Sequence, residues 1–163
     1  MGKKSLILVL IAIGISGAIV FGALLLINED YRDDISSKEL CEFVSEDFGR
    51  MIVSDDDVIL EFNEMTADYL NDYTVAKSFE AKNINEIGIF HSKGEYLGYV
   101  KDIVENYVEE KKMLYRAMDY FPEEITKIDC ADVVCYGNYV IYYFLNETDA
   151  MTLNNQLKNK LTQ

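Results

Sequence analysis

The longest uninterrupted hydrophobic stretch of the chain lies near its N-terminus. Residues 6–27 form a run of 22 residues without one charged side chain. As a helix, a run of this length extends about 33 Å, and the hydrocarbon core of a bilayer is about 30 Å thick. The pattern therefore predicts one membrane-spanning helix.

Basic residues beside this run predict its orientation. Lys3 and Lys4 precede it, whereas residues 28–34 contain a single basic residue, Arg32. Because basic residues are retained on the cytoplasmic side, we expect residues 1–5 in the cytoplasm and the C-terminal part of the chain outside. The expected protein is a single-pass protein of the cell membrane.

A cleaved signal peptide is the alternative interpretation of the same run. The hydrophobic region of such a peptide is usually about 7–15 residues long and ends at a small-residue cleavage site. Here the run is longer, and it continues past the only small-residue site of this kind, near Gly22 and Ala23. We therefore predict that residues 6–27 are an uncleaved signal anchor.

Small residues recur on one face of the predicted anchor. Gly14, Ala18 and Gly22 are spaced four residues apart, a spacing that lets two membrane helices approach closely. Gly and Ala are also common in membrane helices that do not pair. A weak homodimer through these three residues is therefore one interpretation, and chance spacing is the other.

Helical periodicity continues after the anchor. Ser36 and Glu39 form a capping box at the start of an amphipathic segment, and Asn146 can cap a final helix. Pro122 suits the first turn of a short helix. The other expected helices are residues 37–48, a short helix within 63–70, residues 95–118 and a C-terminal helix with Leu153, Leu157 and Leu161 on one side.

Four other segments have the composition of strands, namely residues 75–81, 84–90, 133–136 and 139–145. The last two flank Gly137-Asn138, a two-residue sequence typical of a tight β-hairpin. The expected fold is therefore α+β, a single domain with a mainly antiparallel sheet of about four strands packed against helices. We assign residues 28–35 to an acidic linker and residues 36–163 to this extracytoplasmic domain.

The charge of the chain excludes one class of partner. Two of the 15 basic residues, Lys3 and Lys4, precede the anchor and all 29 acidic residues follow it, so the part after the anchor has a net charge of −16. Such a surface repels nucleic acid, because phosphates need a basic contact surface. We expect a membrane protein with no nucleic-acid partner.

Catalytic and metal-binding motifs are not evident. His91 is the only histidine, and it follows a predicted strand, where ordinary exposure is expected. Cys41, Cys130 and Cys135 are too few for a disulfide framework or a zinc ligand set, although a bond from Cys41 to either of the others stays open. Residues 55–57 are three aspartates that lack the spacing of a calcium loop and are expected to form a solvated turn. We therefore assign no cofactor, no metal ligand and no catalytic residue.

Tyrosines cluster on the predicted terminal hairpin. Tyr139 and Tyr143 share one face of their strand, Tyr142 lies on the other, and Tyr136 is in the partner strand. Tyrosine is enriched at binding surfaces, because its ring offers a large contact area and its hydroxyl is polar. Tyr136, Tyr139 and Tyr143 are therefore either a binding face or part of the core.

The order of these elements, together with two short motifs, resembles a known family. The motifs are the stretch that contains Tyr120, Pro122 and Glu123, and the hairpin sequence Gly137, Asn138, Tyr139. Both follow a hydrophobic strand and a long helix, as they do in the domain of unknown function 4358 family of exported, anchored or lipidated proteins of Gram-positive bacteria. Relatives often carry a basic residue near the position of Glu109, where this chain departs from the pattern. The resemblance implies a localisation and a fold class but no activity.

Two functional hypotheses follow from the sequence. The first is a non-catalytic binding or envelope-interaction module, based on the predicted anchor and on the lack of a recognisable catalytic motif. The second is an envelope hydrolase that uses acidic residues, which would require a cleft with two convergent carboxylates of perturbed pKa. The sequence identifies no ligand for either.

Overall fold

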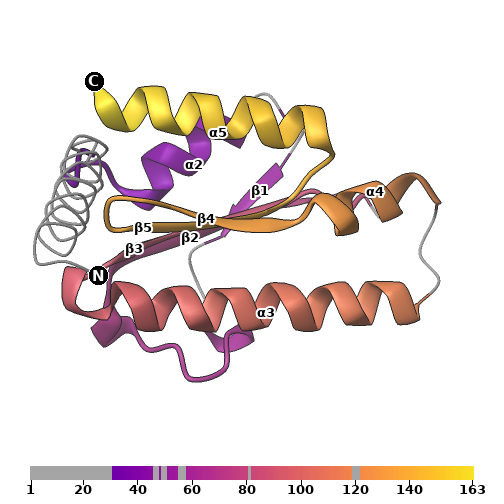
Figure 1. Ribbon diagram of the computed structural model, residues 1–163, viewed down its shortest axis with the longest axis horizontal. Coiled ribbons are helices and arrows are strands. Elements are labelled where there is room, and N and C mark those ends of the chain that lie inside the picture. Colours follow the sequence, from indigo (N-terminus) through magenta and orange to yellow (C-terminus); the bar gives the residue numbers. More distant parts are fainter. Residues whose placement is uncertain (1–30, 46–47, 49–50, 55–57, 81, 119–121) are drawn as a thin grey trace, which may run out of the picture. The chain divides into compact units, whose positions relative to one another are not determined.

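The computed structural model describes residues 31–45, 48, 51–54, 58–80, 82–118 and 122–163. These residues form an antiparallel sheet with helices on both of its faces (Figure 1). In chain order the elements are α2 (Ser37–Ser45), β1 (Met51–Ser54), β2 (Leu70–Ser78), β3 (Glu86–Ser92), α3 (Leu97–Ala117), α4 (Pro122–Cys130), β4 (Asp132–Tyr136), β5 (Tyr139–Phe144) and α5 (Glu147–Thr162). Short 3₁₀ turns lie at η1 (Val58–Glu61), η2 (Ala67–Tyr69) and η3 (Gly94–Tyr96).

The sheet has five strands in the order β1-β2-β3-β5-β4, and every pair is antiparallel. The predicted α+β class and the antiparallel sheet are therefore confirmed. The additional strand is β1, whose four residues pair with the end of β2. So short a segment has too few residues for its alternation to be recognised in the sequence.

The central strand β3 and its neighbour β5 are buried on both faces. All seven residues of β3 and all six of β5 are buried. Helices α2 and α5 cover one face and α3 covers the other, as Figure 1 shows. Residues buried on both faces have no polar side to expose, which explains why β3 and β5 appear in the sequence as nearly continuous hydrophobic runs.

Gly88 makes room for a tyrosine that crosses the central strand. Gly88 lies directly opposite Tyr142 in the β3–β5 pair. A Cβ atom at position 88 would overlap the Tyr142 ring, so only glycine lets this ring lie across β3. The ring is fully buried.

Several predicted ends are confirmed by hydrogen bonds. The backbone amide of Glu39 donates to the Ser36 hydroxyl at 3.2 Å, and that of Asp149 donates to the side-chain oxygen of Asn146 at 2.9 Å. The predicted hairpin is present as β4 and β5, and Gly137 at its turn has a φ of +56°. Helix α4 begins at Pro122, as expected.

Two local predictions are wrong. Residues 63–70 do not form an α-helix, because η2 ends at Tyr69 and β2 begins at Leu70. The second concerns the helix predicted at 95–118, where the three- and four-residue spacing of its apolar residues, Leu114 and Met118 included, predicts one buried face; these two residues are instead 55% and 60% exposed. Helical periodicity reports which residues share a face but not how far the sheet beneath that face extends.

The chain upstream of α2 contacts the domain from Tyr31 onward. Residues 31–35, which we call the entry segment, were expected to belong to the acidic linker; Ile35 is instead buried among the residues beneath α2 and α5. Among the described residues, no helix has the length and hydrophobicity needed to cross a membrane. The predicted anchor at 6–27, including Gly14, Ala18 and Gly22, lies outside those residues, and so do residues 55–57.

We expect Gly88→Ala to lower the free energy of unfolding by about 2–3 kcal/mol, because the added methyl group must displace the buried Tyr142 ring. The matched control is Gly98→Ala in α3, where an added Cβ meets nothing within 4 Å. That change should raise stability by up to about 1 kcal/mol, since alanine is the better helix former. Urea denaturation followed by tyrosine fluorescence measures both, and equal effects would contradict the proposed packing.

Candidate functional site

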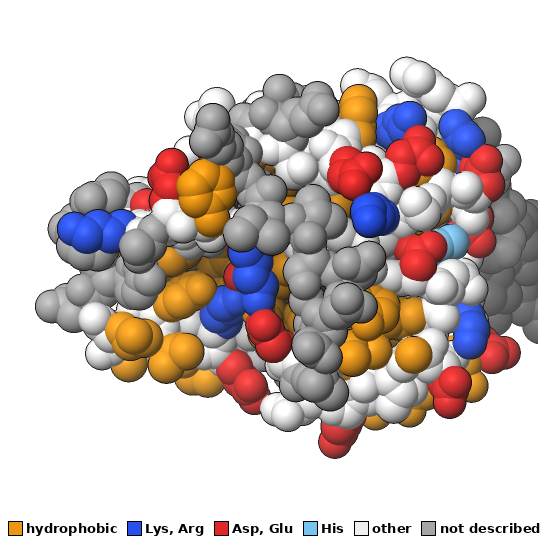
Figure 2. All heavy atoms as spheres, turned by 180° about the vertical axis from the view of Figure 1, so that it is seen from behind, with side chains coloured by type: hydrophobic (Ala, Val, Ile, Leu, Met, Phe, Trp, Pro, Cys, Tyr) orange, Lys and Arg blue, Asp and Glu red, His pale blue; other side chains and the backbone are white. Residues whose placement is uncertain are grey.

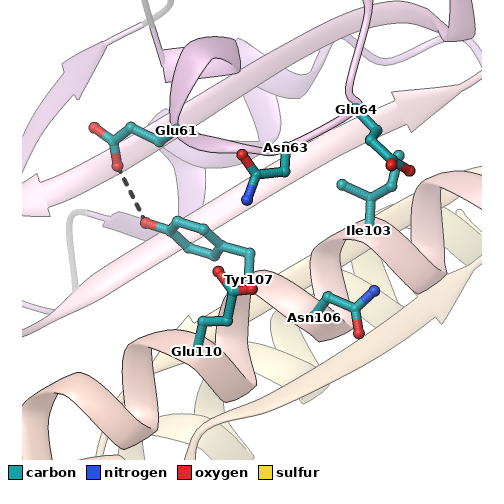
Figure 3. Close-up of a pocket in the computed structure, with 7 residues that line it drawn as sticks. All are labelled: Glu61, Asn63, Glu64, Ile103, Asn106, Tyr107 and Glu110. Carbon is teal, nitrogen blue, oxygen red and sulfur yellow. Dashed lines mark hydrogen bonds between the residues drawn. The ribbon is translucent and has the colours of Figure 1, made fainter.

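A small polar pocket lies between α3 and the loop that follows η1. Its volume is about 180 Å³, and we call it the carboxylate pocket. It is lined by Glu61, Asn63, Glu64, Ile103, Asn106, Tyr107 and Glu110. In Figure 3 Glu61 comes from the end of η1, Asn63 and Glu64 come from the loop after it, and the other four side chains come from α3. Three carboxylates, two amides and a phenol thus surround a space that fits a group of a few atoms.

The loop side of the pocket is fixed by aromatic packing. Phe62 is buried, and its ring centroid lies 4.0 Å from that of Tyr107 and 4.8 Å from that of Phe90. Because Glu61 and Asn63 flank Phe62 in the chain, the burial of this one ring fixes the position of both. The buried Phe62 therefore holds the loop so that its polar side chains face α3.

Glu61 is oriented by two partners on different elements. Lys77 of β2 donates to both carboxylate oxygens at 2.8 and 2.7 Å, and the Tyr107 hydroxyl oxygen lies 3.2 Å from one of them. Burial alone would raise the pKa of Glu61, but the hydrogen bonds and charge of Lys77 outweigh it and lower that pKa. Glu61 is therefore ionised at neutral pH, the state that binds cations and not the state of a general acid.

A buried ionic network lies next to the pocket and shares Tyr107 with it. Its centre is Glu86, the first residue of β3, which is only 3% exposed. Its carboxylate accepts hydrogen bonds from Tyr142 at 2.5 Å, from Tyr107 at 3.0 Å and from Lys111 at 2.5 Å. One buried charge thus holds side chains of β5 and α3 together.

The shifts in pKa around Glu86 reflect this burial. Desolvation lowers the pKa of Lys111, although the charge of Glu86 opposes the shift. Desolvation and the same negative charge raise the pKa of Tyr107 and that of Tyr142 well above the ordinary value. Both tyrosines are therefore neutral hydrogen-bond donors at any physiological pH. Because Tyr107 also lines the pocket, its bond to Glu86 fixes one side chain of the pocket lining.

The predicted tyrosine face belongs to the core. Tyr139 is fully buried and Tyr143 is 4% exposed, both beneath α2 and α5. Tyr136 is half-buried, and its hydroxyl donates to Asn154 of α5 at 3.2 Å. The hypothesis of a binding face made of Tyr136, Tyr139 and Tyr143 is therefore wrong, because α5 covers that side of the hairpin.

The family-like hairpin motif contacts the entry segment. Asn138 donates to the Asp33 carboxylate at 3.1 Å, and the Tyr139 hydroxyl donates to the backbone oxygen of Ile35 at 2.7 Å. A Cβ atom on Gly137 would lie 3.0 Å from the Cβ of Tyr31. All three hairpin positions thus have a structural role in holding the upstream chain. Of the other motif, Tyr120 lies outside the described residues, and Pro122 and Glu123 begin α4.

His91 is buried and not exposed, contrary to the expectation. It is 6% exposed, its ring stacks on that of Tyr139 with centroids 4.4 Å apart, and its Nε2 lies 2.8 Å from an Asp33 carboxylate oxygen. On the other side of the ring, Nδ1 lies 3.7 Å from an oxygen of Asp72. Its position between two carboxylates was not predictable, because Asp33 is 58 residues away in the chain.

The cysteines carry no bond in the structure. Cys41 is buried, Cys130 is half-buried and Cys135 is exposed, and all three are free thiols. Burial raises the pKa of Cys41 to about 12, so it is a small core residue and not a reactive thiol. In the part of the chain that the structure describes, no group of histidine, cysteine, aspartate and glutamate side chains is arranged to hold a metal ion.

Sequence reasoning missed the residues that make the pocket and its network. Glu86 is a charged residue within the hydrophobic strand predicted at 84–90, which is a usable signal, because a carboxylate buried at such a position must be paired. Tyr107 lies within the predicted helix 95–118, where its spacing from apolar residues such as Val104 and Val100 gives no sign that its hydroxyl has a buried partner. Glu61 carried no signal, because it was one of 29 acidic residues.

Comparison with known proteins identifies a family and nothing more specific. The family model Domain of unknown function (DUF4358) matches residues 45–145, which is more than half of the chain. A search of curated proteins and a search of solved structures each found no match. The matched range includes the carboxylate pocket, the Glu86 network and the hairpin motif.

We expect Lys111→Met to lower the free energy of unfolding by about 3–5 kcal/mol, because it leaves Glu86 buried without its counter-charge. The matched control is Lys112→Met, which removes a pair with the exposed Glu109 and should cost less than about 1 kcal/mol. The double variant Glu86→Gln/Lys111→Met should recover part of the loss. Equal effects of the two single variants in urea denaturation would show that the buried pair is not structurally important.

Proposed function

We propose a binding function for this chain, which belongs to the family Domain of unknown function (DUF4358). In this proposal the protein is a membrane-anchored extracytoplasmic domain that binds a small cationic group, such as a primary ammonium, in the carboxylate pocket. The domain performs no catalysis and has no nucleic-acid partner.

The observation that carries the proposal is the composition of the pocket. Glu61, Glu64 and Glu110 supply three carboxylates, and Asn63 and Asn106 add amide oxygens. An ammonium group has three donors and no acceptor, so it matches a lining dominated by acceptors. The net negative charge of the domain favours the approach of a cation over that of an anion.

The fixed geometry of the pocket also supports binding. Glu61 is held by Lys77 before any ligand arrives, and Tyr107, which lies beside Glu61, is held by its hydrogen bond to Glu86. A ligand therefore meets side chains that are already ordered, which reduces the entropy that binding costs.

An acid-dependent hydrolase is the alternative function for the pocket, because three carboxylates line it. Such an enzyme needs one carboxyl with a raised pKa as general acid and one ionised partner. The pKa of Glu61 is lowered, so this residue fits the second role only. The described residues supply a direct reason for cation binding and none for proton donation, and we favour the binding module.

We expect ethylammonium chloride to shift the amide resonances of the pocket residues in a saturable titration, with sodium chloride at equal ionic strength as the reference. Glu110→Gln should weaken this binding at least about fivefold, as a charge-assisted hydrogen bond to the ligand is lost. The matched control is Asp102→Asn on the same helix, which makes the same charge change at an exposed residue that does not line the pocket. Equal weakening in both variants would reduce the effect to general electrostatics and refute the site.

The anchoring part of the proposal has a separate test. Protease added to intact cells should remove the domain at residues 36–163 while the predicted anchor at 6–27 stays with the membrane fraction after carbonate extraction. Protection of the domain from protease would refute the proposed orientation. A mature N-terminus beyond Ala23 would refute the uncleaved anchor.

A further inference from the structure

The entry segment is attached to the domain at one end of the sheet. Its contacts come from three elements: Asp33 lies against His91 of β3, Ile35 exchanges two hydrogen bonds with the Tyr139 hydroxyl of β5, and the Arg32 amide donates to the backbone oxygen of Leu161 in α5 at 2.8 Å. The Tyr31 ring meets that of Tyr136 edge-on, with centroids 5.5 Å apart. The attachment therefore begins at the first residue of the segment.

This attachment leaves very little chain between the domain and the predicted anchor. The anchor ends at Ile27 and the contacts begin at Tyr31, which is four Cα–Cα steps. Four steps of fully extended chain span at most about 14 Å. Had residues 28–35 been a free linker, the same distance would have been about twice as long.

The entry segment, the Gly137-Asn138 turn and η3 lie together at one end of the domain. We call this region the hairpin end. Asn138 bonds to Asp33, the Ser92 amide donates to the backbone oxygen of Asn138 at 2.9 Å, and a Cβ on Gly94 would lie 3.5 Å from the Asn138 side chain. Helix α3 starts directly after η3 and leads away from this end for 21 residues, or about 30 Å.

We propose that the hairpin end is a membrane-facing surface and that the lipid headgroups are its partner. This inference rests on the anchoring part of the proposed function. The docked entry segment holds the hairpin end within about 14 Å of the bilayer, and the rigid α3 carries its own C-terminal end away from it. That distal end exposes Met113 and Leu114 on α3, Met118 directly after α3, and Ile125 on α4. Figure 2, which views the molecule from behind, shows exposed hydrophobic side chains at the left-hand end and others nearer the centre.

Fluorophore depth in reconstituted full-length protein tests this orientation. After Cys130→Ala and Cys135→Ser, a single exposed cysteine is introduced by Glu95→Cys at the hairpin end or by Met118→Cys at the distal end, and Cys41 stays buried. The protein is placed in phosphatidylcholine vesicles that contain a headgroup spin-labelled lipid as quencher. Circular dichroism melting shows whether each variant keeps the fold.

We expect the label at position 95 to be quenched about threefold more than the label at 118, because the two positions are about 30 Å apart along α3. Insertion of a Gly/Ser linker of about 20 residues between Asp30 and Tyr31 should reduce quenching at 95 to the level at 118, since such a linker spans about 25 Å. Equal quenching at both positions without the inserted linker would overturn the orientation. Vesicle flotation separates the two proposals: protein that fails to float refutes the anchor, whereas protein that floats with equal quenching refutes only the membrane-facing end.

Discussion

The buried carboxylate of Glu86 is the constraint on which the α3 face of the domain depends. A charge that is 3% exposed is tolerated only if its oxygens are saturated. Here three donors meet it, two from α3 and one from β5. The rotation of α3 about its axis is thereby fixed, because Tyr107 and Lys111 are one helical turn apart and must point to the same acceptor.

The pocket inherits its geometry from this arrangement. Once Tyr107 is directed at Glu86, its hydroxyl also reaches Glu61, and its ring packs against Phe62. The loop after η1 therefore rests on a side chain whose position is set by the core. Gly88 is part of the same constraint, since Tyr142 could not cross β3 to reach Glu86 if position 88 carried a side chain.

Local patterns predicted the elements well and their partners poorly. The hairpin around Gly137, the capped start of α5 at Asn146 and the long helix α3 were predictable, because each depends on residues close together in the chain. The packing of α3 on β3 places Glu86 beside Lys111, which is 25 residues away in the chain, and no local sequence pattern predicts this contact. The same holds for β1, which acquires strand structure only by pairing with β2.

The tyrosines of the hairpin show why the predicted binding face was wrong although their assignment to strand faces was correct. Strand periodicity correctly put Tyr139 and Tyr143 on one face and Tyr142 on the other. It could not tell whether a helix covers either face, and here helices cover both. Tyrosine suits burial on both faces, because each hydroxyl finds a polar partner: Tyr142 donates to Glu86, Tyr139 donates to Ile35, and Tyr143 accepts from Asn154.

Two polar residues near the ends of β3, Glu86 and His91, hold elements on opposite faces of the sheet. Glu86 and His91 are separated by an odd number of residues, so their side chains leave opposite faces, with about 17 Å of strand between them. Glu86 fixes α3 and the carboxylate pocket on one face, and His91 contacts the entry segment through Asp33 on the other. A rigid, fully buried strand between them means that the pocket keeps a fixed position relative to the point where the chain enters the domain.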